Sequence, residues 1–271
     1  MLRRTSRSVW PGWAGGRPSW AGVGDDAFGS RIEAWLTGAG VDLSLSARPP
    51  LPTALAVADP GEHGNTYRFH LGDTATFALP DRTAEVSRFG AVCVGGLAAV
   101  VEPAAAVVAA TARAAAHGGV LAVDPNVRED RILDPVRSVE RLRELCSLAQ
   151  VVKASDEDLV RLWPDAEPEV SCRRLAEEGR LVVLTRGARG AAAYVQGAPA
   201  VSVPARPVRV VNTIGAGDAF MAGMLTWLGA ETGWRTELSG PETRAMLEYA
   251  AATAASVCAG AGTEPTAPLG V

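Results

Sequence analysis

The chain has 271 residues, of which 48% are hydrophobic, and a formal net charge of −4 at pH 7. This length and apolar content suffice for one main α/β domain, while the acidic balance and the lack of Lys/Arg-rich runs exclude a general nucleic-acid binder. The four cysteines are scattered, which argues against a disulfide framework or a zinc site, and we expect them to be reduced core thiols. No apolar run reaches the roughly 20 residues that span a bilayer. We therefore expect a cytoplasmic protein without a membrane partner.

The first segment, residues 1–22, holds three tryptophans among Gly, Pro, Ser and Arg. It shows neither helical nor strand periodicity and therefore predicts no folded element. A helix follows, because Asp25 or Asp26 is a good N-cap. Ile32 and Leu36 then give this helix an apolar face.

A hairpin is predicted next. Two β-patterned runs, residues 53–58 and 66–71, flank a segment rich in Asp, Pro, Gly and Asn. The second run carries Tyr67, Phe69 and His70. An ordinary hairpin with one apolar face explains this pattern.

From residue 91 onward, short buried strands alternate with helices. We expect strands at residues 91–94, 120–123, 181–184 and 191–195, and helices at residues 103–117, 135–148 and 241–258. This alternation predicts the α/β class, with a doubly wound, mostly parallel sheet. Ligands of such sheets bind beyond the carboxyl ends of the strands.

The run Asp-Pro-Asn-Val-Arg, residues 124–128, lies at that edge of the predicted sheet. The Arg128 guanidinium is suited to a bidentate phosphate contact there. The alternative is a common Asp-Pro-Asn turn with a solvated arginine.

Two further segments have the composition of helix caps or phosphate loops. Ser155 is a good N-cap and Asp158 lies in the first turn that follows, so capping alone would explain both residues. Thr185, Gly187 and Gly190 form a glycine-rich loop between two predicted strands. From its residue types alone, that loop closes a hairpin between the two strands.

The strongest signal is a glycine turn between a β-branched run, residues 208–211, and a small, apolar helix that begins near residue 216. We expect the run to be a strand and the turn, Gly215 to Gly217, to be the helix N-terminus. Such a terminus binds anions through its unpaired amides and its dipole. Asp218, in the first turn, is either a base or an ordinary helix-start residue.

The whole segment, N-T-I-G-A-G-D-A-F, resembles the D-T-x-G-A-G-D-x-F signature of the ribokinase-like (PfkB-type) carbohydrate kinases. G-D-D-A-F-G, D-P-N-V-R and T-R-G-A-R-G support the resemblance in family order. It implies a ribokinase-like fold with a small β lid at residues 52–72, and ATP and Mg²⁺ as cofactors. The details of the D-P-N-V-R run look most like bacterial fructokinase-type members.

The resemblance also implies a role for each matching position. Asp218 would be the catalytic base, and Gly215, Ala216 and Gly217 would form the anion hole. ATP would contact Lys153, Ser155, Thr185, Gly187, Gly190 and Ala250, and the substrate would contact Asn126 and Arg128. Asp158 would act on Mg²⁺ indirectly. Asn212 stands where the family has an Asp that helps organise a monovalent-cation site, which puts cation activation in doubt.

The family's first strand and its G-G-x-x-x-N segment are not visible in the given reading frame. In a shifted frame, residues 1–16 can encode A-P-A-N-V-A-V-G-L-A-G-L-G-G, which supplies that segment. We therefore expect residues 1–18 to be a frameshifted or mis-started segment and residues 19–271 to be the kinase domain. The alternative is chance compatibility, which codon degeneracy favours.

The expected function is phosphorylation of a sugar hydroxyl by ATP, with fructose first among the sugars. Whether the chain as given is active stays open at this point, because the first sugar-binding segment is not visible in the given frame. A 2-keto-3-deoxygluconate or nucleoside kinase is the alternative within the family. The alternative outside it is a nucleotide-binding remnant that lacks the first sugar-binding segment. A homodimer that forms through the lid is the expected assembly.

Overall fold

The computed structural model describes residues 18–61, 64–86, 88–128, 133–260 and 262. The expected frameshifted segment, residues 1–18, thus lies outside the described residues apart from Pro18. Within the described part, no helix is both long and apolar enough to cross a membrane.

The described elements follow the α/β alternation that the sequence predicts. The strands are β1 Leu55–Gly61, β2 Gly64–His70, β3 Ala91–Gly95, β4 Val120–Asp124, β5 Val151–Ser155, β6 Leu181–Thr185, β7 Ala191–Tyr194 and β8 Val201–Val203. The helices are α1 Ala27–Gly38, α2 Thr83–Val86, α3 Ala104–Gly118, α4 Pro135–Leu148, α5 Asp156–Leu162, α6 Pro168–Glu177, α7 Ala216–Thr232 and α8 Gly240–Cys258. Short 3-10 turns occupy Ala75–Phe77, Gly96–Ala99 and Gly187–Arg189.

The central sheet has six strands in the order β3-β4-β5-β6-β7-β8. Strands β3 to β6 pair in parallel, and β7 and β8 add to the edge in antiparallel fashion. The mostly parallel sheet is therefore confirmed. In the register, Gly95 lies beside Asp124 and Ser155 beside Thr185, so the candidate loops leave the sheet from the same edge.

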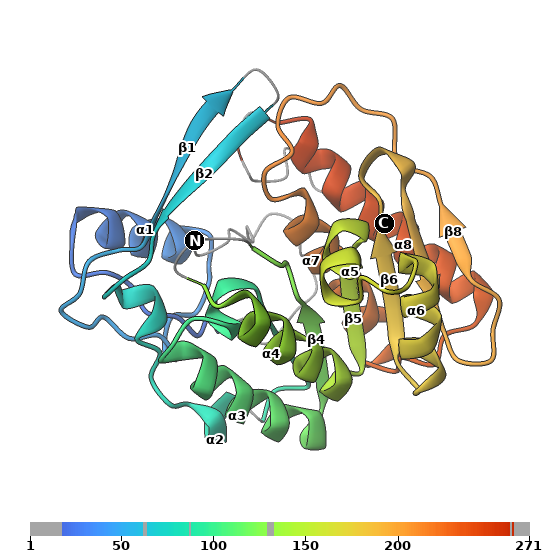
Figure 1. The fold of residues 1–271 in the computed structure, drawn as a ribbon, viewed down its shortest axis with the longest axis horizontal. Helices are drawn as coiled ribbons and strands as arrows, with labels where there is room; N and C mark the ends of the chain where they lie inside the picture. Colours follow the sequence, from blue (N-terminus) through green and yellow to red (C-terminus); the bar gives the residue numbers. More distant parts are fainter. Residues whose placement is uncertain (1–17, 62–63, 87, 129–132, 261, 263–271) are drawn as a thin grey trace.

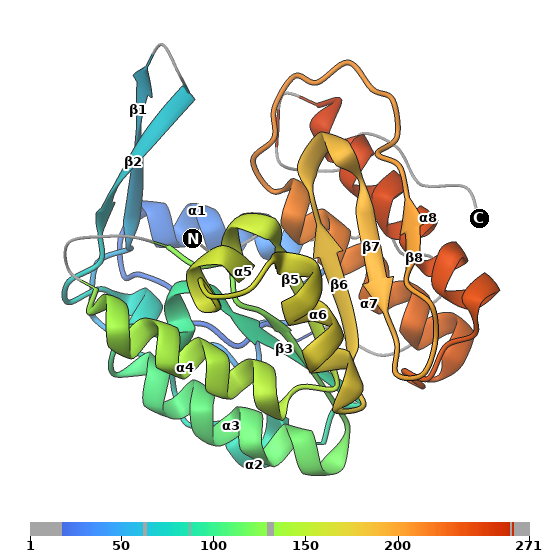
Figure 2. The same cartoon turned by 45° about the vertical axis from the view of Figure 1, so that its right-hand side comes forward.

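Alternate side chains of the strands enter two separate cores. Val152 and Leu184 face one way, into a cluster that α3, α4, α5 and α6 complete. Val151 and Val183 face the other way, into a cluster with α7 and α8. Helices therefore cover both faces of the sheet (Figures 1 and 2), as the run of apolar strands requires.

The hairpin of β1 and β2 forms a two-stranded antiparallel sheet of its own and projects from the body beside α1 (Figure 1). Asp26 links α1 to the hairpin, because its carboxylate accepts hydrogen bonds from the amide and hydroxyl of Thr53 and from the amide of Gly29. These bonds, that of the Thr53 amide foremost, lower the pKa of Asp26 to about 2. Of the two predicted caps for α1, Asp26 is the one used. The Tyr67 side chain lies outside the described ones.

Two expectations are wrong. Residues 208–211 are not a strand: Val208, Val210 and Val211 are exposed, and no neighbouring strand pairs with them among the described residues. β-branched residues favour a strand only where a partner and a packing surface exist. Cys93 is not a core thiol but is exposed on β3, at the edge of the described sheet.

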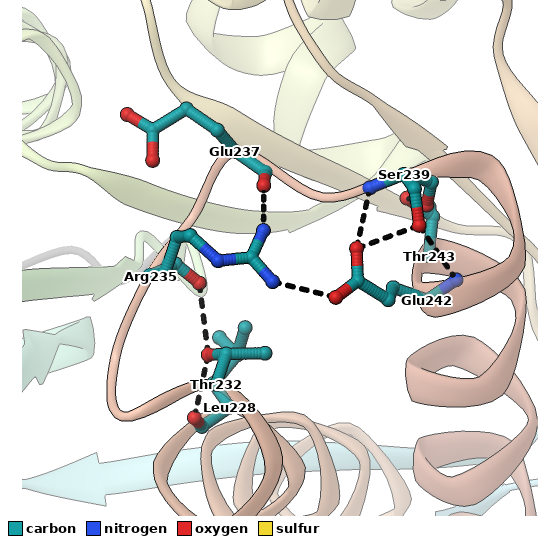
Figure 3. Close-up of polar contacts among 7 residues, drawn as sticks. All are labelled: Leu228, Thr232, Arg235, Glu237, Ser239, Glu242 and Thr243. Atoms are coloured by element: carbon teal, nitrogen blue, oxygen red, sulfur yellow. Dashed lines mark hydrogen bonds and ion pairs between the residues drawn. The ribbon is translucent and has the colours of Figure 1, made fainter.

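A polar network closes the connection between α7 and α8 (Figure 3). The Ser239 hydroxyl and the Glu242 carboxylate form a reciprocal capping box at the start of α8, and Arg235 bonds the same carboxylate at 2.5 Å. The Ser239 hydroxyl foremost, then the Ser239 amide and Arg235, lower the pKa of Glu242 to about 2. The network ties the end of α7 to the start of α8.

Candidate active site

The N-terminus of α7 begins at Gly215, which has a left-handed conformation with φ of 84°. No side chain caps this 17-residue helix, and the Ala216 amide donates to the Thr213 carbonyl at 3.2 Å. The positive end of the helix dipole is therefore not neutralised by a side chain. Phe220, Met221 and Met224 are buried in the core between α7 and the sheet and hold the helix in place. Asp218 lies in the first turn and is partly exposed.

The segment before α7 is held by the end of α8. The amides of Val211 and Asn212 donate to the carbonyl of Cys258 at 2.8 and 3.3 Å. The Asn212 side-chain oxygen accepts from the amide of Ile214 at 3.0 Å and so closes a local turn. This turn sets the direction in which the glycines approach α7.

A buried ion pair lies beneath that helix end. Lys153 Nζ is 2.9 Å from Asp124 Oδ2, and the two residues are 4% and 8% exposed. A Cβ atom on Gly217 would lie 3.2 Å from the same Nζ, so the ammonium group contacts the first turn of α7. Lys153 and the glycine turn, which the resemblance groups in one site, therefore lie together.

Asp158 connects the two loops at the ends of β4 and β5. Its carboxylate accepts from the Val127 amide at 2.8 Å and from the Ser155 amide at 2.9 Å, while the Ser155 hydroxyl accepts from the Asp158 amide. Both oxygens of Asp158 are thus engaged by backbone amides. Burial raises the pKa of the nearby Cys146 thiol to about 12, and the charges of Asp124 and Asp158 add to that shift.

The candidate substrate residues follow β4. Asn126 has a left-handed conformation with φ of 42°, which asparagine tolerates better than most residues. Arg128 is exposed, and its Nη1 donates to the neighbouring Val127 carbonyl at 3.3 Å. The guanidinium therefore remains accessible to an anion.

The loop after β6 contains a short 3-10 turn, Gly187–Arg189. Gly187 has φ of 53° and open space around it, whereas Gly190, with φ of 84°, is pressed against the carbonyl of Val203. The Thr185 hydroxyl donates to the Ala154 carbonyl of β5 at 3.4 Å. Gly187 presents its backbone to solvent, while Gly190 has a packing role.

Ala250 does not fit the expected contact with adenine. It is fully buried, and a Cβ on Gly223 of α7 would lie 2.9 Å from the Ala250 Cα. Its small size instead lets α7 and α8 pack closely. A ligand would have to separate the two helices to reach it.

Asp124 lies in the Asp-Pro-Asn-Val-Arg run, but no role was predicted for it. Its signal was a carboxylate at the end of an all-apolar strand, next to a strand that carries a lysine among apolar residues. Among the described residues, no group of three or more His, Cys, Asp or Glu side chains is arranged to hold a metal ion.

The sequence matches the family described as pfkB family carbohydrate kinase over residues 12–269. The chain belongs to this family. The PfkB signature at Asn212 to Phe220 therefore lies in a true family member, and its glycine turn begins a helix as the residue types predict.

Several similar proteins carry the name fructokinase. The fructokinase of Salmonella typhimurium is 31% identical over 260 residues, which cover 92% of this chain and 83% of that protein. The fructokinase of Rhizobium leguminosarum bv. trifolii is 31% identical over 212 residues, or 76% of this chain and 64% of that protein.

Solved structures of PfkB kinases share the fold. The crystal structure of the fructokinase of Vibrio cholerae O395 with fructose, ADP and calcium ion has a TM-score of 0.80 at 26% identity and covers 94% of this chain and 83% of that one. The ATP-bound fructokinase of Xylella fastidiosa has a TM-score of 0.81 at 23% identity, with 90% and 79% covered.

Proposed function

We propose that this PfkB protein transfers a phosphoryl group from ATP to a hydroxyl of a sugar, and that fructose is the first sugar to test. The observation that carries the proposal is the uncapped N-terminus of α7, where Gly215 turns the chain and Asp218 stands in the first turn. The fructokinase relatives, and the fructose and ADP in the solved Vibrio cholerae structure, support the choice of substrates.

The residues present suggest how each part of the reaction is served. The amides of Gly215, Ala216 and Gly217 hold the negative charge that develops on the transferred group. Asp218 accepts the proton of the attacking hydroxyl. Because phosphoryl transfer needs chiefly positioning and charge stabilisation, a helix end and a carboxylate beside it suffice for this chemistry.

On the nucleotide side, we assign ATP contacts to Lys153, Ser155, Thr185 and the open backbone at Gly187. Gly190 shapes that loop. Mg²⁺ is commonly bound through few carboxylates together with substrate phosphates, which agrees with the absence of a metal-ligand cluster among the described residues. When bound, it would neutralise phosphate charge. Asp158 acts on this region indirectly, since it fixes Val127 and Ser155.

On the sugar side, we assign Asn126 and Arg128 to substrate or phosphate contacts and the β1–β2 hairpin to the lid. Leu55 and Val57, which are 37% and 48% exposed, form an apolar strip on the hairpin. Such a strip suits either a bound sugar or the lid of a second subunit. We propose that two subunits form a homodimer through this lid.

We also propose weak dependence on monovalent cations. A variant of the Vibrio cholerae fructokinase has been solved in a potassium-bound form. Here, Asn212 has no charge, and its oxygen already accepts a hydrogen bond from Ile214. Coulombic attraction for potassium at this position is correspondingly smaller.

The test is to incubate the purified 271-residue protein with Mg-ATP and one acceptor at a time, and to detect the product by ³¹P NMR. The acceptors are fructose, 2-keto-3-deoxygluconate and a nucleoside, with a sample without acceptor as control. We expect a new sugar-phosphate signal with fructose. A signal with another acceptor alone would replace fructose, and ATP binding without any phosphorylated product would identify a nucleotide-binding remnant.

A further inference from the structure

Lys153 is the single lysine of the chain, and every other basic residue among the 26 is arginine. It is also buried, with 4% of its surface exposed. Arginine presents a broad planar fork, whereas lysine ends in a compact ammonium group with three rotatable donors. A buried lysine in a chain that otherwise uses arginine indicates a site where a compact cation is needed.

Strand geometry directs this cation to α7. Val151 belongs to the core under α7 and α8, and because side chains alternate along a strand, Lys153 points to the same face. Asp124 is related in the same way to Ala122 on β4, which is paired with Val151. The two charged groups are therefore neighbours on the face that α7 covers.

The pair has unused bonding capacity. Of the three donors on Lys153 Nζ, one bonds Asp124 Oδ2, and the described residues supply no other acceptor. Asp124 Oδ1 is buried and has no partner among them. Buried polar groups of native proteins are nearly always satisfied, and a buried ion pair stabilises a fold poorly unless its remaining bonds are made. An incomplete pair at a helix N-terminus points to a ligand.

We propose that Lys153 is a catalytic residue that donates a hydrogen bond to the transferred phosphoryl group inside the anion hole. Its Nζ already lies against Gly217, so the ammonium adds a full charge to the partial charge of the helix end. Asp124 is a positioning residue that holds the ammonium and balances its charge while the hole is empty. This inference rests on the kinase proposal and names the group that its anion hole uses.

The single lysine permits a direct observation. Protein labelled with ¹³C-lysine gives one lysine Cε–Hε signal, whatever the size of the protein. Titration with Mg-ATP should shift that signal, whereas adenosine should leave it in place, because only ATP brings a phosphoryl group to α7. A signal that is identical with saturating ATP and without it would overturn the proposal.

Substitutions separate a phosphoryl contact from a purely structural pair. Lys153→Met leaves Asp124 buried and unpaired and can fail to fold, so the decisive protein is Lys153→Met/Asp124→Asn, which removes both charges. Arg161→Met is the matched control, since it removes a cation from α5 that lies 3.9 Å from Glu157 at the surface. Folding is checked by thermal unfolding, and the dissociation constants of ATP and ADP are measured by calorimetry.

In the double variant, we expect the ratio of the ADP to the ATP dissociation constant to fall about tenfold or more, while the dissociation constant of ADP changes little. A fall of this size corresponds to the loss of one hydrogen bond to a charged group. The control should keep the wild-type preference. A structural pair would weaken both nucleotides alike, so a preference within twofold of wild type in the folded double variant would overturn the inference. If the wild-type protein binds no ATP, the kinase proposal fails and takes this inference with it. If it binds and prefers ATP but phosphorylates no acceptor, the kinase proposal fails, and Lys153 is a phosphate-binding residue without a catalytic role.

Discussion

At the scale of single residues, Gly215 holds a backbone conformation that residues with a side chain rarely adopt. Its φ of 84° lies in the left-handed region, which costs other residues about 1–2 kcal/mol. We therefore expect Gly215→Ala to lower the free energy of unfolding by about 1 kcal/mol in urea denaturation.

Gly38→Ala provides the matched control, because Gly38 ends α1 with nothing within 4 Å of an added Cβ. It should raise stability by about 0.5 kcal/mol, since glycine is the less favourable residue in a helix. Equal effects of the two substitutions would show that Gly215 does not need its left-handed conformation.

Some features of the site could be predicted from the amino-acid sequence and others could not. Asp218 and the glycine turn were predictable, because a helix N-terminus depends on local residue types. The pairing of Lys153 with Asp124 was not, because it depends on the register of two strands that are separated by a whole helix. The burial of Ala250 was also hidden, since it follows from the approach of α7 to α8.

At the scale of elements, the connection between α7 and α8 should respond to pH through Glu242. Its folded-state pKa is about 2, against 4.5 in its ordinary state, so the ionised form is the one that the fold favours. The stability that Glu242 contributes is therefore complete above about pH 4.5 and is lost as the pH falls through about 2.

Glu242→Gln removes that contribution at every pH, so its melting temperature should fall below the wild-type value at pH 6 and approach it towards pH 2. Glu248→Gln, an exposed position on the same helix, is the matched control and should follow the wild type throughout. A difference between wild type and Glu242→Gln that does not shrink in acid would exclude ionisation of Glu242 as the cause.

The starts of several helices could be predicted from sequence patterns alone. Helices α1, α5 and α8 begin at side chains that cap them, and these caps are readable as residue types. The run at residues 208–211 has strand composition but no strand, because pairing partners are a property of the fold and not of the run. The short α5 formed as expected, since Ser155 and Asp158 complete a capping box.

At the scale of the whole molecule, the alternation of strands and helices was predictable from the apolar runs, and each crossover between β3 and β6 returns to a parallel neighbour. This order places the ends of β3, β4, β5 and β6 along one edge, with the first turn of α7 in contact with Lys153 of β5. Helices α3 to α6 pack on one face of the sheet and form one core. Helices α7 and α8 pack on the other face, form the second core and place the N-terminus of α7 at the candidate site.

The most direct test of this account is the turnover of Asp218→Asn with fructose and Mg-ATP. A carboxylate that acts as general base contributes about 10²–10⁴-fold, so kcat should fall about a thousandfold while the dissociation constant of ATP stays within about twofold. Asp165→Asn, at an exposed position, is the matched control and should turn over like the wild type. If Asp218→Asn keeps a tenth or more of the wild-type kcat, Asp218 is not the base and the proposed mechanism is wrong.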